Sequence, residues 1–430
     1  MLPESVIEYT KCEDYPMTKG ILNAYNSFEH GGNIYRPAEE LKMQERKIMD
    51  FSASVNPLGV SKKIKTEMRR HLKYLHNYPD HEAKRLRKRL AQYHGIDPET
   101  ILCGNGSTEL IYLITRVLKP QKVLIPAPTF SEYERAIILQ NTPPPPLPSY
   151  VLTDLPQGEG KGGGESQVSG IREQGSIKYF MLDKGNGFEV IPDRLIQAMQ
   201  GEDSLATPCD MAFLCNPNNP TGRLLKKDAV LKIADAARDL KCILVVDEAF
   251  IDFCADGSVI KDVEDIQSMI VLRSMTNFHA LSGLRIGYGV FPQHLIGSLK
   301  RYKEPWTVNN LAQRAAVVAL KDKIYRSETF RLLKEEKRFL EKSFKKIGIE
   351  FFDSDVNFYL LKISNANEIF QQMKRKGILV RDCSNFRGLD NTYLRVAVKS
   401  HKENTILIKE LTSILPPLSV PPYQGGDKAG

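Results

Sequence analysis

Several features that mark other protein classes are missing from this chain of 430 residues. No apolar stretch approaches the roughly 18 residues that a membrane-spanning helix needs. The seven cysteines are scattered without metal-ligand spacing, so they indicate reduced thiols rather than a zinc site or a disulfide framework. No charged start followed by an apolar segment opens the chain. These absences favour a cytoplasmic globular protein without a membrane partner.

The positive charge is not gathered into a nucleic-acid-binding surface. The formal net charge is +8 and the isoelectric point is near 8.9. Basic and acidic residues alternate in LKEEKRFLEKSFKK (333–346), which is typical of a solvated helix face. No basic stripe with interleaved aromatic residues is present. The composition therefore argues against a nucleic-acid partner and suits small anionic ligands.

What the sequence does contain is an alternation of strand and helix patterns. The segment ETILCGNGSTELIYLITRVL (99–118) predicts a strand, a glycine-rich turn and a helix, and KVLIPAPTF (122–130) predicts another buried strand. The alternation continues through residues 210–225, 241–253 and 268–277. This order predicts an α/β fold with a mainly parallel sheet that helices cover on both faces.

The same patterns divide the chain into parts. Short strands with helices between them, after the long helical patterns that follow Trp306, predict a second, smaller α+β domain. Proline and glycine runs predict an inserted surface loop and a disordered tail. The predicted parts are an N-terminal extension (1–28), a small domain (29–71 and 326–415), a large domain (72–325) with the insertion at 141–176, and the tail (416–430).

Three motifs lie where predicted strands end. GNGSTE (104–109) offers backbone N–H groups and a helix N-terminus to an anion, although a tight turn that needs glycine would give the same pattern. NPNNPTG (216–222) places Asn219 at the carboxyl edge of the sheet, where open α/β folds bind ligands. VVDEAF (245–250) ends a buried strand with Asp247, whose carboxylate needs a cation such as the protonated ring nitrogen of pyridoxal phosphate.

Taken in this order, the motifs resemble the fold type I pyridoxal-phosphate enzymes from about residue 30 to residue 415. The resemblance implies a large domain with a seven-stranded type of sheet, a small α+β domain, pyridoxal 5′-phosphate as cofactor, and a homodimer. It also implies roles for single residues. The phosphate is held by Gly106, Ser107, Thr108, Ser274 and Arg285, the ring is covered by Phe130 or Tyr133, Asn219 bonds the ring hydroxyl, Asp247 pairs with the ring nitrogen, and Tyr78 reaches the phosphate in the neighbouring subunit.

Within these enzymes, the closest resemblance is to threonine-phosphate decarboxylase. HGGN (30–33), DFSASVNPLG (50–59) and the segment 380–398 resemble that family. Phe250 stands where related aminotransferases usually have tyrosine. The resemblance implies decarboxylation of L-threonine O-3-phosphate to (R)-1-amino-2-propanol phosphate for cobalamin biosynthesis. A histidinol-phosphate type of aminotransferase is the alternative.

The implied substrate carries two anionic groups, a phosphate and an α-carboxylate, and needs two sets of donors. The resemblance assigns this role to Arg381 and Arg395 and leaves open which arginine meets which anion. It adds His30, Gly31 and Asn219 to the substrate site, although a histidine beside two glycines is also common in turns. Ser54 stands where the family pattern has asparagine, so serine phosphate is a second hypothesis for the substrate.

The cofactor lysine of the family is absent. In VLRSMTNFHALSGLRIGYGVF (271–291) its position is occupied by Asn277, and the nearest lysines along the chain are Lys261 and Lys300. An amide cannot form the covalent bond that a lysine amine forms with the cofactor, and it cannot return a proton to Cα. Negligible turnover is therefore expected. Three explanations compete: an engineered or accidental change, a noncatalytic protein that binds pyridoxal phosphate or phosphoamino acids, and an enzyme using another group such as His279.

Overall fold

The computed structural model describes residues 30–141, 176–201 and 207–415. Its contacts divide the chain into a large unit, Val55–Phe330, and a small unit made of residues 1–54 and 331–430. Residues 55–71, which the sequence assigned to the small domain, cluster with the large unit because α3 (Lys62–His71) packs there on α11 (Asn310–Ala319). The predicted extension, the tail, and the insertion apart from Asn141 and Ser176 lie outside the described residues.

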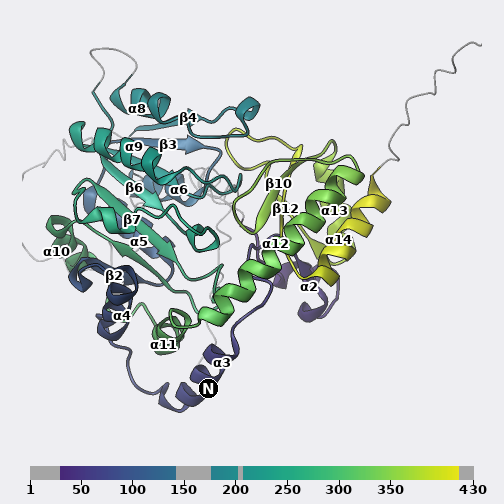
Figure 1. The fold of residues 1–430 in the computed structure, drawn as a ribbon, viewed down its shortest axis with the longest axis horizontal. Coiled ribbons are helices and arrows are strands. Elements are labelled where there is room, and N and C mark those ends of the chain that lie inside the picture. The colour runs from purple at the N-terminus through teal and green to yellow at the C-terminus, as the bar shows by residue number, and fades with distance from the viewer. Residues whose placement is uncertain (1–29, 142–175, 202–206, 416–430) are drawn as a thin grey trace, which may run out of the picture. The chain divides into compact units, whose positions relative to one another are not determined.

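A seven-stranded sheet forms the centre of the large unit (Figure 1), in the order β2-β8-β7-β6-β5-β3-β4. β8 runs antiparallel to both of its neighbours, and the other pairs are parallel. The predicted mainly parallel sheet is therefore confirmed. The strands are β2 (Ile101–Gly104), β3 (Lys122–Ala127), β4 (Ser176–Met181), β5 (Met211–Cys215), β6 (Ile243–Asp247), β7 (Met269–Ser274) and β8 (Gly287–Val290).

Helices cover both faces of this sheet, as the uninterrupted apolar strands require. Leu244 and Val246 of β6 belong to a core with α3, α4, α8, α9 and α11, whereas Val245 between them belongs to a second core with α5, α6 and α10. Alternate residues of one strand thus bury against opposite layers. The helices are α3 (Lys62–His71), α4 (Lys84–His94), α5 (Ser107–Leu118), α6 (Glu132–Asn141), α8 (Pro192–Gln200), α9 (Lys227–Asp239), α10 (Gln293–Tyr302) and α11 (Asn310–Ala319).

Two features of the large unit differ from the sequence prediction. β8 was not predicted, because glycines at 287 and 289 weaken a strand pattern. A Cβ at 287 would collide with the backbone nitrogen of Ser107, and one at 289 would collide with the ring of Phe291. The proline- and glycine-rich segment was expected between two strands, but the helix α6 precedes it and β4 follows it.

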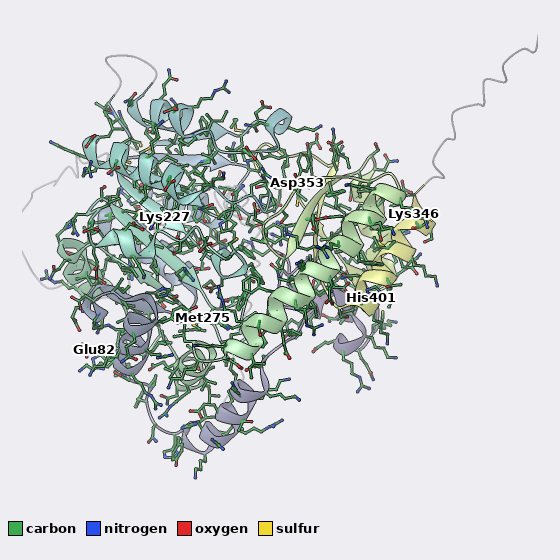
Figure 2. All side chains as sticks on the ribbon, in the orientation of Figure 1. Glu82, Lys227, Met275, Lys346, Asp353 and His401 are labelled. Carbon is green, nitrogen blue, oxygen red and sulfur yellow. The ribbon has the colours of Figure 1, made fainter. Side chains whose placement is uncertain are left out.

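The small unit contains two sheets of its own. The larger is antiparallel in the order β12-β13-β10-β9, and the smaller pairs β1 with β11 in parallel. His401, labelled in Figure 2, begins α14, and its Nδ1 lies 3.1 Å from a carboxylate oxygen of Glu336 on α12. The elements are β1 (Met49–Asp50), β9 (Glu350–Phe351), β10 (Phe358–Lys362), β11 (Ile378–Leu379), β12 (Arg381–Asp382), β13 (Tyr393–Ala397), α2 (Tyr35–Glu40), α13 (Ala366–Arg375), α14 (His401–Ile414), and α12 (Lys323–Lys346), within which the division between the units falls.

Short 3-10 helices complete the described secondary structure. They are η2 (Glu45–Lys47), η3 (Leu72–Tyr74), η4 (Pro98–Thr100), η5 (Lys184–Asn186), η6 (Ile251–Phe253) and η7 (Ile260–Val263). Within the described part of the chain, no helix has both the length and the apolar character needed to cross a membrane. The same residues hold no group of three or more His, Cys, Asp or Glu side chains that could bind a metal ion.

Candidate cofactor and substrate sites

The N-terminus of α5 is the candidate site for the cofactor phosphate. Gly106 precedes the helix with φ of 82°, and no side chain caps it. The first-turn N–H groups, which include those of Ser107 and Thr108, have no partner within the helix and can bind an anion. The predicted glycine-rich turn and the start of the helix are where the sequence placed them.

Other predicted phosphate ligands gather at the same point. A Cβ at residue 106 would crowd Nη2 of Arg285, and the φ of 82° at this position also favours glycine. Ser274 pairs with Gly287 across β7 and β8, and Gly287 lies against the backbone nitrogen of Ser107. Segments far apart in the chain therefore meet at the start of α5.

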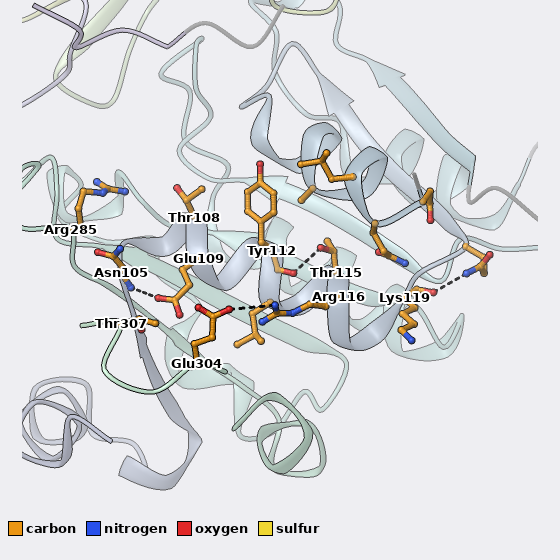
Figure 3. A pocket seen from close by; sticks show the side chains of 16 residues that line it. Asn105, Thr108, Glu109, Tyr112, Thr115, Arg116, Lys119, Arg285, Glu304 and Thr307 are labelled. Atoms are coloured by element: carbon orange, nitrogen blue, oxygen red, sulfur yellow. Dashed lines mark hydrogen bonds and ion pairs between the residues drawn. The ribbon is translucent and has the colours of Figure 1, made fainter. Parts of the chain in front are cut away.

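The charge of this site favours an anion. Burial lowers the pKa of Arg285, and no carboxylate among the described residues lies within ion-pair distance of it. Figure 3 shows Arg285, Asn105 and Thr108 among the side chains that line a cavity of about 1160 Å³. A bound phosphate would be an anionic partner for Arg285, which has no carboxylate partner among the described residues.

Asp247 ends β6 with its side chain buried, at 2% exposure. The hydroxyl of Tyr133 donates to Oδ2 at 2.8 Å, and the N–H of Ala249 donates to Oδ1 at 3.0 Å. No lysine, arginine or histidine in the described part of the chain forms an ion pair with Asp247, and burial raises its pKa to about 6. The carboxylate has two donors but no cation, which fits a protonated ring nitrogen beside it.

The two aromatic residues predicted to cover the ring have different surroundings. Tyr133 is fully buried, stacks on Phe213 with ring centroids 4.7 Å apart, and uses its hydroxyl to hold Asp247. Phe130 is half-buried and meets Tyr133 edge-on at 5.6 Å. Phe130 is therefore the better candidate to contact a ring, and Tyr133 is better described as positioning the carboxylate.

Asn219 lies in the loop after β5 and is 8% exposed. The neighbouring Asn218 fixes this loop, because its amide donates to the carbonyl of Pro128 and to Oγ1 of Thr221, each at 3.0 Å. The side-chain oxygen Oδ1 of Asn218 accepts a hydrogen bond from Oγ1 of Thr129 at 2.8 Å. The sequence prediction named Asn219 but missed Asn218, for which the repeated asparagine of NPNNPTG was the available signal.

Asn277 lies half-buried in the segment that follows β7. The backbone carbonyl of Asn277 accepts a hydrogen bond from the backbone N–H of Asn56 at 2.9 Å. The Asn56 side chain donates to the carbonyl of Phe278 at 2.9 Å and to Oγ1 of Thr329 at 2.8 Å. Asn56 therefore holds the backbone at 277 and 278 through contacts that do not involve the side chain at 277. The sequence prediction missed it, although it lies in the motif DFSASVNPLG.

The two predicted substrate arginines are direct neighbours in the small unit. Arg381 on β12 is the Cα partner of Arg395 on β13, and both are buried. Arg395 donates to the carbonyl of Ser52 at 2.8 Å, and Arg381 donates to the carbonyl of Asp382 at 2.6 Å and to Oδ1 of Asn385 at 2.8 Å. Burial, together with the charge of Arg381, lowers the pKa of Arg395 to about 10. Two buried cations side by side favour an anionic ligand.

The other predicted substrate residues also belong to the small unit. His30, Gly31 and Arg381 line one cavity of about 510 Å³. A Cβ at residue 31 would collide with the carbonyl oxygen of Ser52, which explains the glycine of the HGGN motif. Ser54 is 4% exposed, and its hydroxyl has no hydrogen-bond partner among the described residues.

The predicted residues thus form two groups, one in each unit. The predicted cofactor ligands, Asn219 included, lie in the large unit, and the remaining substrate residues lie in the small unit. Tyr78 belongs to the large unit, is 81% exposed, and has its ring centroid 5.2 Å from that of Trp306.

Comparison with known proteins identifies the family. A profile of the aminotransferase class I and II family matches residues 46–151 and 171–411. The chain belongs to this family. It is 32% identical over 390 residues to threonine-phosphate decarboxylase of Salmonella typhimurium, which spans 90% of this chain and 96% of that one. It is 31% identical over 396 residues to the adenosylcobalamin biosynthesis bifunctional protein CobDQ of Leptospira interrogans, spanning 90% of this chain and 41% of that one.

Solved structures agree with this membership. L-threonine-O-3-phosphate decarboxylase from Porphyromonas gingivalis is 26% identical, with a TM-score of 0.68 over 85% of this chain and 99% of that one. Histidinol-phosphate aminotransferases are also among the relatives. The predicted resemblance, the fold type I architecture, and pyridoxal 5′-phosphate as the cofactor are confirmed at the level of the family. The uncapped helix, Arg285 and Asp247 fit that cofactor.

Proposed function

We propose that this chain carries the cofactor and substrate sites of an L-threonine O-3-phosphate decarboxylase that forms (R)-1-amino-2-propanol phosphate for cobalamin biosynthesis in the cytoplasm. We further propose that Asn277 leaves it with negligible turnover. The observation that carries the proposal is the buried pair of Arg381 and Arg395, whose adjacent positive charges suit a substrate with two anionic groups. The names of the relatives in Salmonella typhimurium and Leptospira interrogans support it.

The charged residues of the two sites each have a role in this reaction. When bound, pyridoxal phosphate accepts the electron pair left at Cα as the carboxylate departs. The N-terminus of α5 and Arg285 bind its phosphate, and Asp247 keeps a negative charge beside its ring nitrogen. Arg381 and Arg395 bind the phosphate and carboxylate of the substrate, and this anchoring fixes which bond at Cα is aligned for cleavage.

Asn277 removes two steps from that sequence. A lysine amine at this position would bind the cofactor covalently and would deliver a proton to Cα after carbon dioxide leaves. An amide does neither, so the chain binds cofactor noncovalently through the phosphate and ring contacts alone. Because Asn56 holds the backbone here through contacts that do not involve the side chain at 277, Asn277→Lys should leave the local backbone unchanged.

His279 does not replace the missing amine. It is 9% exposed, and burial lowers its pKa to about 4, so the imidazole is neutral near pH 7. An imidazole cannot form the covalent bond that a primary amine forms with the cofactor aldehyde. The noncatalytic explanation and the altered-enzyme explanation both remain consistent with the site, and both predict binding without turnover.

The two alternative activities depend on single positions. An aminotransferase of the histidinol-phosphate type would gain from a hydroxyl at position 250, but Phe250 offers none. Serine phosphate is the second substrate hypothesis because Ser54 replaces the longer amide of the family pattern, and its hydroxyl oxygen is buried without a partner among the described residues. The second alternative therefore concerns substrate size and not reaction type.

Calorimetric titration of the cofactor-loaded chain with the two phosphoamino acids tests the substrate. We expect threonine phosphate to bind more tightly than serine phosphate, and Ser54→Asn to increase that preference. Ser327→Asn, an exposed serine on α12, is the matched control and should leave the preference unchanged. A parent chain that prefers serine phosphate, with the preference reversed only by Ser54→Asn, would contradict threonine phosphate as the substrate.

We also propose a homodimer in which the partner subunit's Tyr78 reaches the cofactor phosphate. The large exposure of Tyr78 and Trp306, which lie together on the surface of the large unit, supports an interface there. Sedimentation of the parent chain should give the mass of two chains. A measured mass of 48.6 kDa, that of a single chain, would contradict the proposal.

A further inference from the structure

A second cavity in the large unit shares no lining residue with the candidate cofactor site. Its volume is about 460 Å³, which is within the range of small-molecule sites. Residues of α4, η6, β8, the start of α12 and the segment after β7 line it. Met275 of that segment is labelled in Figure 2. Met275, Phe278 and His279 line the cavity and flank Asn277 in the chain. The segment after β7 therefore contributes both to this cavity and to the position of the cofactor lysine.

The carboxylates that line this cavity are already paired with cations outside its lining. Oδ1 of Asp252 lies 2.5 Å from Nη2 of the buried Arg273. Oδ1 of Asp322 lies 2.9 Å from Nζ of Lys63. Although burial alone would raise the pKa of Asp252, Arg273 holds it below the ordinary value. Both acids are therefore ionised and paired, although Asp252 shares Arg273 with Glu248.

The cations that line the cavity have no such partners. Arg89, Lys323 and Arg326 form no ion pair within the described ranges 30–141, 176–201 and 207–415. The guanidinium of Arg326 lies over the rings of Phe278 and Phe330, at 5.4 and 5.1 Å from their centroids. This stacking fixes its plane while its N–H groups make no hydrogen bond to described residues. The cavity thus has a surplus of positive charge with one guanidinium already oriented.

Two buried polar atoms of the lining also lack partners. Nε of Arg89 and Nδ1 of His279 are both inaccessible to solvent and form no hydrogen bond among the described residues. His279 is 91% buried, since its exposed fraction is 9%. A buried polar atom without a partner costs free energy unless a ligand or an ordered water satisfies it. Arg89 and His279 both line the same space as the unpaired cations.

We propose that this cavity is a second ligand site, which binds a small metabolite bearing a phosphate or carboxylate group through the guanidinium groups of Arg326 and Arg89. The space is too large for an inorganic anion alone, so an organic portion fits beside the oxyanion, against Met275 and Phe278. The site is independent of the proposed decarboxylation, because none of its lining residues takes part in it.

Equilibrium dialysis of the full chain tests the proposal with two probes, inorganic phosphate and citrate, which separate a phosphate ligand from a carboxylate ligand. The double variant Arg285→Gln/Arg395→Gln weakens both the phosphate site at α5 and the proposed substrate site of the small unit, so binding that it retains belongs to neither. We expect saturable binding of at least one probe that this double variant retains. Arg326→Gln should weaken it at least about tenfold, as expected for a lost hydrogen bond to a charged group.

The matched control is Arg331→Gln, an exposed arginine on the same helix, which should bind as the parent does. Circular dichroism and thermal unfolding show whether Arg326→Gln remains folded, and Arg89→Gln is the second variant if it does not. Absence of saturable binding beyond that lost in Arg285→Gln/Arg395→Gln would overturn the proposal. Unchanged affinity in a folded Arg326→Gln or Arg89→Gln chain would also overturn it.

Discussion

Replacing Asp247 with asparagine removes the negative charge next to the proposed position of the ring nitrogen while keeping the shape of the side chain. The two hydrogen-bond partners, the Tyr133 hydroxyl and the Ala249 N–H, can still be satisfied by an amide, because the hydroxyl can accept where it formerly donated. We therefore expect Asp247→Asn to fold as the parent does. The loss should appear in cofactor affinity.

The size of that loss follows from the pKa of the carboxyl. Burial raises the pKa of Asp247 to about 6 in the chain without cofactor. A ring cation that restores the ordinary value of about 3.9 shifts it by roughly two units, or about 2.7 kcal/mol. Above pH 6 the parent should therefore bind pyridoxal phosphate about 100-fold more tightly than Asp247→Asn does.

The sign of the pH dependence is also fixed. The complex favours the ionised carboxyl, so its pKa is lower in the complex than in the free chain. The advantage of the parent is complete above pH 6 and is lost, about tenfold per unit, as the pH falls through 6 toward 4. Below that range the two proteins should bind equally.

Equilibrium dialysis with pyridoxal phosphate between pH 5 and pH 8 measures this ratio. The titration of the free cofactor is common to both proteins and cancels in the ratio of their affinities. Asp265→Asn, an exposed carboxyl of the same unit, is the control and should change nothing. Equal affinities of parent and Asp247→Asn at pH 8, or a ratio that does not vary with pH, would refute the assignment of Asp247 to the ring nitrogen.

The structure makes two further predictions about stability. Arg273→Ala leaves two buried carboxylates without their cation and should lower the free energy of unfolding in urea by about 3–5 kcal/mol, whereas Arg238→Ala, an exposed ion pair, should lower it by at most about 1 kcal/mol. Equal losses would show that the Arg273 network is not buried. Gly287→Ala places a Cβ against the backbone nitrogen of Ser107, so it should lower both the melting temperature and the affinity for pyridoxal phosphate. A variant that melts with the parent would contradict that close approach.

Much of the fold could be predicted because the sequence patterns that specify these strands are local. Apolar runs predicted β3, β5, β6 and β7. β8 was not predicted because its glycines are required by close packing against Ser107 and Phe291, which lie outside the strand itself. A residue chosen for a distant contact carries no local pattern.

The candidate site divides in the same way. Motif positions such as Gly106 and Asp247 could be named from the sequence because they stand at strand ends. The positioning contacts could not. Tyr133 was named as a residue covering the ring, but its hydrogen bond to Asp247 spans 114 residues. Asn56, which was not named, reaches Phe278 across 222 residues. Such pairings depend on the folded topology, which periodicity and turn chemistry do not specify.

The absorbance spectrum of the purified chain with pyridoxal phosphate, compared with that of Asn277→Lys, tests the central claim most directly. Each protein is then given threonine phosphate while carbon dioxide release is followed. We predict that Asn277→Lys gains the absorption band of covalently bound cofactor and releases carbon dioxide, while the parent binds cofactor without either change. Carbon dioxide release by the parent at the rate of Asn277→Lys, or none from a cofactor-loaded Asn277→Lys, would contradict the account.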